Sequence, residues 1–172
     1  GKIIYGLLSN LIGNSNTFQS DWYRNVSSKY QIGNLSKISQ EQMTERNNGS
    51  VWQMYFYDDD DGAVSFQSFL QIFSDKNWSI KAVDTLFVII QSKTGTPVTI
   101  YANRPKAEYT GQPAVEHLLD SLKLVPDVLI HRGHSYYSYK TIDKIQRSTK
   151  VFVLGSCGGY NSLSNILTKA PD

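Results

Sequence analysis

Two residues with nucleophile or base chemistry stand near the end of the chain, each where an apolar run stops. His134 follows "VLIHRG", and Cys157, the single cysteine, follows "VFVLGS". Both runs are typical of buried strands, and the adjacent Gly133 and Gly158 allow the backbone to turn sharply. Since a neighbouring histidine favours the thiolate form of a cysteine, the two residues could be a nucleophile and its general base.

The elements between these residues predict that they meet. "DVLIH" and "KVFVLG" are expected strands, and "YKTIDKIQRS" between them has Tyr139, Ile142 and Ile145 at helical spacing. Strands that are apolar throughout and joined by one helix are typical of a parallel pair buried on both faces. Their carboxyl ends then share one edge of the sheet, where α/β proteins bind ligands, and neighbouring strands lie about 4.8 Å apart. A helix is expected directly after the cysteine.

The three histidines have different expected roles. His134 lies beyond a glycine, in the loop, and is the candidate base. His131 is the last residue of a buried strand, so we expect it to pack or to form hydrogen bonds next to the site. His117 falls on the polar side of a predicted helix and is expected at the surface.

The first part of the chain, residues 1–50, is expected to be helical and to pack on the main domain. It is rich in Asn, Ser and Gln, but apolar residues recur at helical spacing near residues 1–12 and 21–30. A third helix is predicted from Ser39, because Ser39 and Gln42 have the spacing of a capping box.

Residues 51–172 are expected to form one α/β domain. "VWQMYFY" predicts a strand and "DDDDG" a tight turn, followed by a helix capped by Ser65 in "SFQSFLQIF". "TLFVIIQS" and "PVTIYAN" predict a hairpin around "KTGT", to which "WSIKAV" adds a further strand. The next helix is expected from about Pro113.

Composition excludes several classes of protein. The chain of 172 residues is 40% apolar and has a net charge of +2 without a basic cluster, so neither nucleic acid nor a membrane is an expected partner. One cysteine cannot form an internal disulfide or alone hold zinc, which leaves a buried apolar thiol or a reactive one. The start at Gly1 rather than Met suggests a processed product or a piece of a longer protein.

Other chemistries fit the spacing less well. The acidic run at 58–61 lacks the first and last ligands of a calcium loop, since Tyr57 and Ser68 stand at those positions, and a solvated turn is favoured. A metal site from His131, His134 and Cys157 has no fixed geometry across the strand end. "GSCGG" is similar to the nucleophile elbow of α/β-hydrolases, but in that fold the histidine follows the nucleophile.

The blocks "VLIHRGHS" and "VFVLGSC" resemble the caspase-like superfamily of cysteine peptidases, which includes caspases, legumain, separase, clostripain and the gingipains. Members carry an apolar strand that ends in a His-Gly motif, a crossover helix, and a second apolar strand that ends in the nucleophile. "YFYDDDDGAVSF", "IYANRP", "HRGHSYY" and "LGSCGGYN" are most similar to uncharacterised bacterial members.

The resemblance implies a three-layer caspase-like fold and hydrolysis of a peptide bond without a cofactor or metal. Cys157 would be the nucleophile, His134 the general base, and the backbone N–H groups of Ser135 and Cys157 the oxyanion hole, with Gly133, Gly158 and His131 in support. Ser135 departs from the pattern, since the superfamily has glycine there. The alternative function is a catalytically inactive interaction module of a larger bacterial protein.

Overall fold

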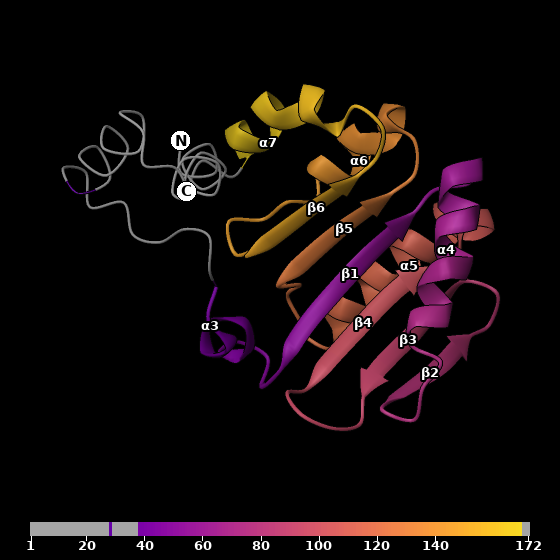
Figure 1. The fold of residues 1–172 in the computed structure, drawn as a ribbon, viewed down its shortest axis with the longest axis vertical. Coiled ribbons are helices and arrows are strands. Elements are labelled where there is room, and N and C mark those ends of the chain that lie inside the picture. The colour runs from indigo at the N-terminus through magenta and orange to yellow at the C-terminus, as the bar shows by residue number, and fades with distance from the viewer. Residues whose placement is uncertain (1–27, 29–37, 170–172) are drawn as a thin grey trace, which may run out of the picture.

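The computed structural model describes Ser28 and residues 38–169. Within this part, six strands form one sheet in the order β2-β3-β4-β1-β5-β6 (Figure 1). The strands are β1 (Ser50–Phe56), β2 (Trp78–Val83), β3 (Phe87–Ser92), β4 (Val98–Asn103), β5 (Val128–Arg132) and β6 (Val151–Gly155). The α-helices are α3 (Gln40–Thr44), α4 (Asp60–Ile72), α5 (Glu108–Ser121), α6 (Ser138–Ile142) and α7 (Leu163–Lys169).

The sheet is mostly parallel and lies between two layers of helices. β1 pairs in parallel with β4 and with β5, and β5 pairs in parallel with β6. β2, β3 and β4 are antiparallel neighbours, which confirms the predicted hairpin and its extra strand. The expected α/β class is thereby confirmed for residues 51–169, at the level of a three-layer architecture.

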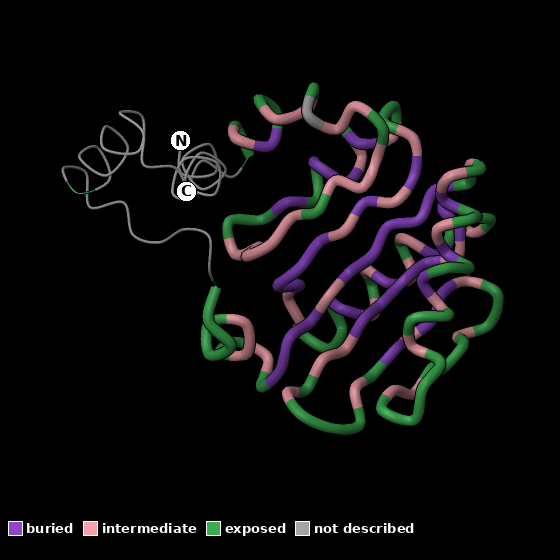
Figure 2. Tube along the Cα trace, viewed as in Figure 1, coloured by how far each residue is buried: buried purple, intermediate pink, exposed green. Residues whose placement is uncertain are grey.

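Side chains of β1 alternate between two cores because the strand is apolar on both faces. Met54 and Phe56 pack against Phe66 and Phe69 of α4 on one face. On the other face, Val51 packs with α5, and Tyr55 packs with Ile142 of α6 and Ile166 of α7. Figure 2 shows β1 as a buried stripe through the middle of the sheet.

The acidic run is the start of α4, and the prediction of a tight turn was wrong. Asp59 is the N-cap, and its Oδ1 accepts a hydrogen bond from Gly62 N at 2.6 Å. Asp60 and Asp61 lie in the first turn, where acidic side chains interact favourably with the helix dipole. Gly62 is required because a Cβ there would lie 2.1 Å from the Tyr57 carbonyl oxygen.

Two other predicted helix boundaries were wrong. α5 begins at Glu108 rather than near Pro113, because the buried Glu108 carboxylate is anchored by the backbone N–H of Asp58 at 2.7 Å. α6 ends at Ile142, although Ile145 beyond it is still buried in the same core. Helix α6 is therefore much shorter than the pattern in 139–148 predicted.

β6 was expected to be buried on both faces, and this was wrong as well. It is an edge strand, and Val153 is 42% exposed. Figure 1 shows that α6 and α7 cover one face of β5 and β6, while on the other face α4 lies over β1 and packs against Ile130 of β5. An apolar strand composition does not distinguish a central strand from an edge strand that is covered on one side.

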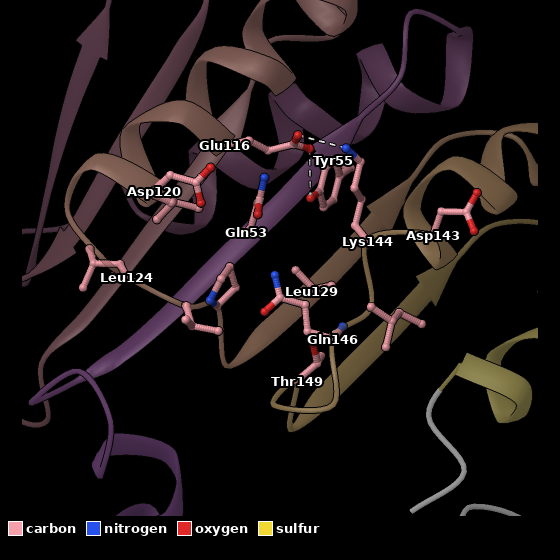
Figure 3. A pocket seen from close by; sticks show the side chains of 14 residues that line it. Gln53, Tyr55, Glu116, Asp120, Leu124, Leu129, Asp143, Lys144, Gln146 and Thr149 are labelled. Carbon is pink, nitrogen blue, oxygen red and sulfur yellow. Dashed lines mark hydrogen bonds and ion pairs between the residues drawn. The ribbon is translucent and has the colours of Figure 1, made fainter.

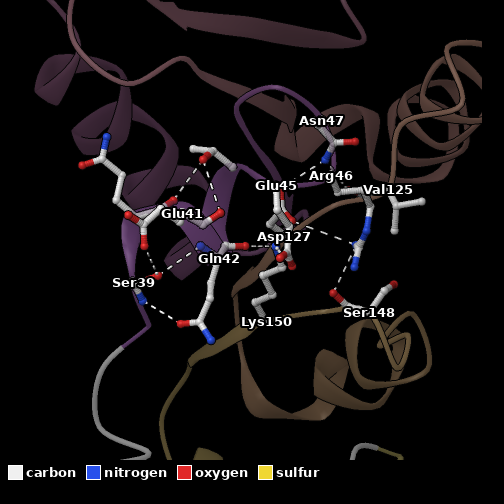
Figure 4. Close-up of polar contacts among 12 residues, drawn as sticks. Ser39, Glu41, Gln42, Glu45, Arg46, Asn47, Val125, Asp127, Ser148 and Lys150 are labelled. Carbon is white, nitrogen blue, oxygen red and sulfur yellow. Dashed lines mark hydrogen bonds and ion pairs between the residues drawn. The ribbon is translucent and has the colours of Figure 1, made fainter.

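The segment before the sheet is fixed by a polar network at the amino ends of the strands (Figure 4). α3 begins with the predicted capping box, in which Ser39 Oγ accepts from Gln42 N and Ser39 N donates to Gln42 Oε1. Asp127, fully buried, accepts from Val51 N at 3.0 Å and faces Lys150 Nζ at 3.2 Å. The helices predicted within 1–12 and 21–30 lie, apart from Ser28, outside the described residues.

The helices of the described residues are also too short to cross a bilayer. The longest, α5, has 14 residues. A membrane span needs about 20 apolar residues in one helix.

Candidate functional site

His134 and Cys157 leave two adjacent parallel strands at equivalent positions. Every paired residue of β6 lies 23 positions after its β5 partner, ending with Arg132 opposite Gly155. Cys157 lies the same number of positions after His134, each two residues beyond that last pair. The predicted adjacency of the two strands is therefore confirmed.

His134 is held by the acidic start of α4. Its Nδ1 lies 3.2 Å from Asp61 Oδ2, and the two side chains are 39% and 48% exposed. The ring also stacks on Tyr136, with 5.3 Å between ring centroids. With Nδ1 directed at a carboxylate, the tautomer that donates from Nδ1 leaves Nε2 as a proton acceptor.

Asp59 connects the loop of His134 to the end of β1. One carboxylate oxygen caps α4, and the other accepts a hydrogen bond from His134 N at 2.9 Å. Gly133 lets this contact form, because a Cβ at that position would lie 2.9 Å from both Asp59 Oδ2 and Tyr57 Cβ. The supporting role predicted for Gly133 thus has a steric basis in the backbone's approach to Asp59.

His131 lies beneath the site and is fully buried. Its Nδ1 is 2.8 Å from Thr141 Oγ1, which is also 2.8 Å from the Tyr57 hydroxyl. Burial lowers the pKa of His131 below its usual value, so the ring is neutral at pH 7. This agrees with the expectation that His131 packs and forms hydrogen bonds rather than acting as the exposed base.

Cys157 is exposed, so its alternative interpretation as a buried core residue was wrong. Gly158 follows it with φ of +68°, a conformation that glycine adopts without strain. The expected helix does not begin directly after the cysteine, since a 3-10 turn at Gly159–Ser162 precedes α7. Among the described residues, no hydrogen bond joins Cys157 to His134.

The backbone around the two residues leaves donors free. The N–H groups of Ser135 and Cys157 take no part in the loop and cap hydrogen bonds of the described residues. Ser135 is exposed and begins a 3-10 turn, and its side chain occupies the position where glycine was expected. Two N–H groups at the ends of neighbouring loops are the kind of donors that stabilise an oxyanion.

One buried polar atom at this edge of the sheet, Oγ of Ser156, has no hydrogen-bond partner within the described residues. Nε2 of His131 has no partner of good geometry there either, although backbone groups of His134 and Gly133 lie close enough to the ring to oppose the lowering of its pKa by burial. Most buried polar atoms in proteins are paired, and those left unpaired concentrate at strained or functional positions. At the carboxyl ends of β5 and β6 there is therefore hydrogen-bonding potential that the other described residues do not fully satisfy.

Lys140 and several tyrosines form the rim beside the site. Lys140 Nζ lies 3.3 Å from the buried Glu108 and 4.7 Å from the centroid of the Tyr137 ring. Tyr137 in turn stacks on Tyr57 with 4.7 Å between centroids. Tyr109, Tyr136 and Tyr139 are exposed large side chains on this rim.

The metal alternatives gain no geometric support. Within residues 38–169 no group of three or more His, Cys, Asp or Glu side chains is placed to hold an ion. The region considered as a calcium loop is a capped helix start in which Tyr57 is buried. His131 is directed at Thr141 and His134 at Asp61, so the two histidines do not converge.

The sequence analysis missed Asp59 and Asp61 as residues of the site. They follow β1, and the position of β1 beside β5 brings them to the loop of His134. The available signal was an acidic run directly after a buried strand, the position at which parallel sheets place polar site residues. It was interpreted only as a turn or a calcium loop.

Because of the buried phenol of Tyr57, the free energy of unfolding is expected to fall as the pH rises above 10. Burial is the largest cause that raises its pKa from 10.0 to about 12. Because the pKa is higher in the folded state, the contribution of Tyr57 to the free energy of unfolding is complete below pH 10 and is lost as the pH rises toward 12. The total loss is about 2.7 kcal/mol, and roughly half of it is expected by pH 11. Urea unfolding of the native chain and of Tyr57→Phe on both sides of pH 10 measures this. An equal decline in both proteins would contradict it.

Similarity to known proteins adds nothing to this geometry. No protein-family model, curated protein or solved structure matches the chain.

Proposed function

We propose that this chain is a caspase-like cysteine peptidase domain that hydrolyses peptide bonds through Cys157 and His134. The observation that carries the proposal is the equivalent placement of the two residues, each two positions beyond the last pair of adjacent parallel strands. The histidine precedes the cysteine along the chain, as in the superfamily that the two motifs resemble. The exposed thiol and the carboxylate behind the imidazole support the same assignment.

The proposed reaction uses groups of the chain alone. His134 Nε2 takes the proton of the Cys157 thiol, and the thiolate sulfur attacks the scissile carbonyl carbon. The N–H groups of Ser135 and Cys157 stabilise the oxyanion. The tetrahedral intermediate collapses when the C–N bond breaks, and His134 gives its proton to the leaving amine. Water then hydrolyses the thioester, with His134 as base, and the thiol is restored.

Asp61 has a positioning role in this reaction. Its carboxylate lies 3.2 Å from His134 Nδ1, so it holds the ring orientation in which Nε2 faces away from α4. Asp59 fixes the backbone of the same residue through His134 N. The side chain and the backbone of His134 are thus each anchored to the acidic segment that follows β1.

The test is cleavage of a diverse peptide library, read by mass spectrometry. We expect cleavage by the native chain, none by Cys157→Ala, and labelling of the native thiol by a peptidyl acyloxymethyl ketone. Ser164→Ala is the matched control, since this exposed serine of α7 lies outside the candidate site and the variant leaves the thiol unchanged. A native thiol that reacts with neither iodoacetamide nor the ketone would refute the proposal.

A second candidate function is a catalytically inactive interaction module. The exposed fractions of Tyr109, Tyr136 and Tyr139, 76%, 60% and 59%, favour it because exposed tyrosines are common in protein interfaces. The Ser135 side chain, where glycine is expected, favours it too. Library cleavage that is lost in Cys157→Ala would exclude this candidate.

A further inference from the structure

A cleft separate from the candidate active site lies on the face of the sheet that α5 and α6 cover. It has a volume of about 300 Å³ and is bounded by α5, by the segment before β5 and by the loop before β6 (Figure 3). This volume is at the lower end of that of small-ligand sites. The cleft exists because α6 ends at Ile142, so that the loop 143–149 leaves part of β1 uncovered.

The floor of the cleft contains a buried amide. Gln53 of β1 is 4% exposed, and Figure 3 shows its side chain pointing into the cleft between Asp120 and Tyr55. Within the described residues the only side-chain partner of the Gln53 amide is the neighbouring phenol of Tyr55. An amide has one acceptor oxygen and two N–H donors, so the Gln53 amide can still bind a polar group of a ligand in the cleft.

The wall of the cleft carries negatively charged side chains, and one of them has no ion-pair partner within the described residues. Glu116 pairs with Lys144 at 2.9 Å and lies 3.5 Å from the Tyr55 hydroxyl. Asp143 pairs with Lys169 at 2.9 Å. Asp120 has no ion pair within the described residues, although it lies one helical turn after Glu116 on α5. Two carboxylates at this spacing on a helix repel each other, and the Lys144 ammonium pairs with only one of them.

The remaining wall is apolar. Leu119, Leu129 and Ile145 are buried and line the cleft between the amide and the charged rim. A group that fills the space must therefore carry methylene carbons along its length and a hydrogen-bond donor at its end. An anion would meet the carboxylates of Glu116 and Asp120, and a purely apolar molecule would leave part of the Gln53 amide unpaired.

We propose that this cleft binds an aliphatic ammonium or guanidinium cation. Its methylene carbons pack on Leu119 and Leu129, and its N–H groups donate to the Gln53 side-chain oxygen and to the Asp120 carboxylate. The same chemistry is present in a free alkylamine and in the side chain of a peptide lysine or arginine. The cleft shares no residue with the site at His134 and Cys157, so this inference is independent of the proposed function.

The test is NMR titration of the full chain labelled with ¹⁵N. n-Butylammonium is expected to shift the Gln53 side-chain NH₂ resonances, whereas n-butanol and butyrate at equal concentration are not. Acetyl-lysine amide in the same titration distinguishes the two sources: tighter binding than n-butylammonium indicates a peptide side chain, and equal or weaker binding a free amine. Either ranking is consistent with a cation site.

Two variants and a control make the test specific. Asp120→Asn and Gln53→Leu are each expected to raise Kd about 10-fold or more, as for the loss of one hydrogen bond to a charged group. Asp84→Asn, exposed at the far end of β2, should leave Kd unchanged. The proposal is overturned if n-butylammonium does not shift Gln53, if n-butanol binds equally well, or if Asp120→Asn binds like Asp84→Asn. Asp120 is exposed, so this variant keeps the fold even if Gln53→Leu does not.

Discussion

Replacement of Asp127 with alanine is expected to lower the free energy of unfolding by about 3–5 kcal/mol, as for removal of one partner from a buried ion pair. Asp127 is fully buried, and its Oδ2 accepts hydrogen bonds from Val51 N and Asn47 Nδ2. Its Oδ1 faces Lys150 Nζ at 3.2 Å, and that lysine side chain is only 13% exposed. The variant leaves the buried N–H of Val51 without its acceptor, and Lys150 keeps only the exposed Glu45 as a carboxylate partner. Urea unfolding gives the free energy.

The matched control is an ion pair of similar length at the surface. Asp143 lies 2.9 Å from Lys169, and the side chains are 63% and 45% exposed. Asp143→Ala is expected to change the free energy of unfolding by less than about 1 kcal/mol, because water solvates both charges when the pair is broken. Similar losses in the two variants would show that burial does not set the strength of the Asp127 network.

Loss of the His134 imidazole is expected to slow peptide cleavage by about 100-fold or more, the usual contribution of a general acid or base. The same substitution, His134→Ala, should slow alkylation of Cys157, because the thiol loses the group that takes its proton. Both rates can be measured on the same preparations by mass spectrometry. This prediction rests on the proposed function, and unchanged rates in the variant would refute the pairing of the two residues.

Asp61→Asn tests the positioning role separately. We expect a smaller loss, about 10-fold, because the imidazole is still present but the tautomer that donates from Nδ1 is no longer favoured. Asp60→Asn is the matched control, since Asp60 is in the same helical turn and makes no contact with His134. ¹⁵N spectra of the imidazole report the tautomer directly. Equal effects of the two substitutions would remove Asp61 from the site.

The local sequence predicted the strands better than the way in which they assemble. The motifs around His134 and Cys157 predicted two neighbouring parallel strands, because one helix between two apolar runs permits few arrangements. The position of β1 between β4 and β5 could not be predicted, since it depends on contacts between residues far apart in the sequence. For this reason Asp61 was missed, because it reaches His134 only through the strand order.

Helix boundaries were missed for a related reason. The pattern of phenylalanines identified α4 correctly but not its first turn, which is specified by hydrogen bonds of Asp59 to both Gly62 and His134. The start of α5 likewise depends on the contact of Glu108 with Asp58. Such contacts join segments that are separate in the sequence, and periodicity in one segment carries no information about them.

The central place of β1 also determines when the chain can fold. Its partners are distant in sequence: Ser50 pairs with Val98 of β4, and Trp52 with Val128 of β5. During synthesis, β1 emerges from the ribosome long before either partner, and closing such long loops slows folding. The hairpin of β2 and β3 can form early, whereas the middle of the sheet must wait for the second half of the chain. Asp59 and Asp61, which follow β1, can therefore reach His134 only after the second half of the chain has been made.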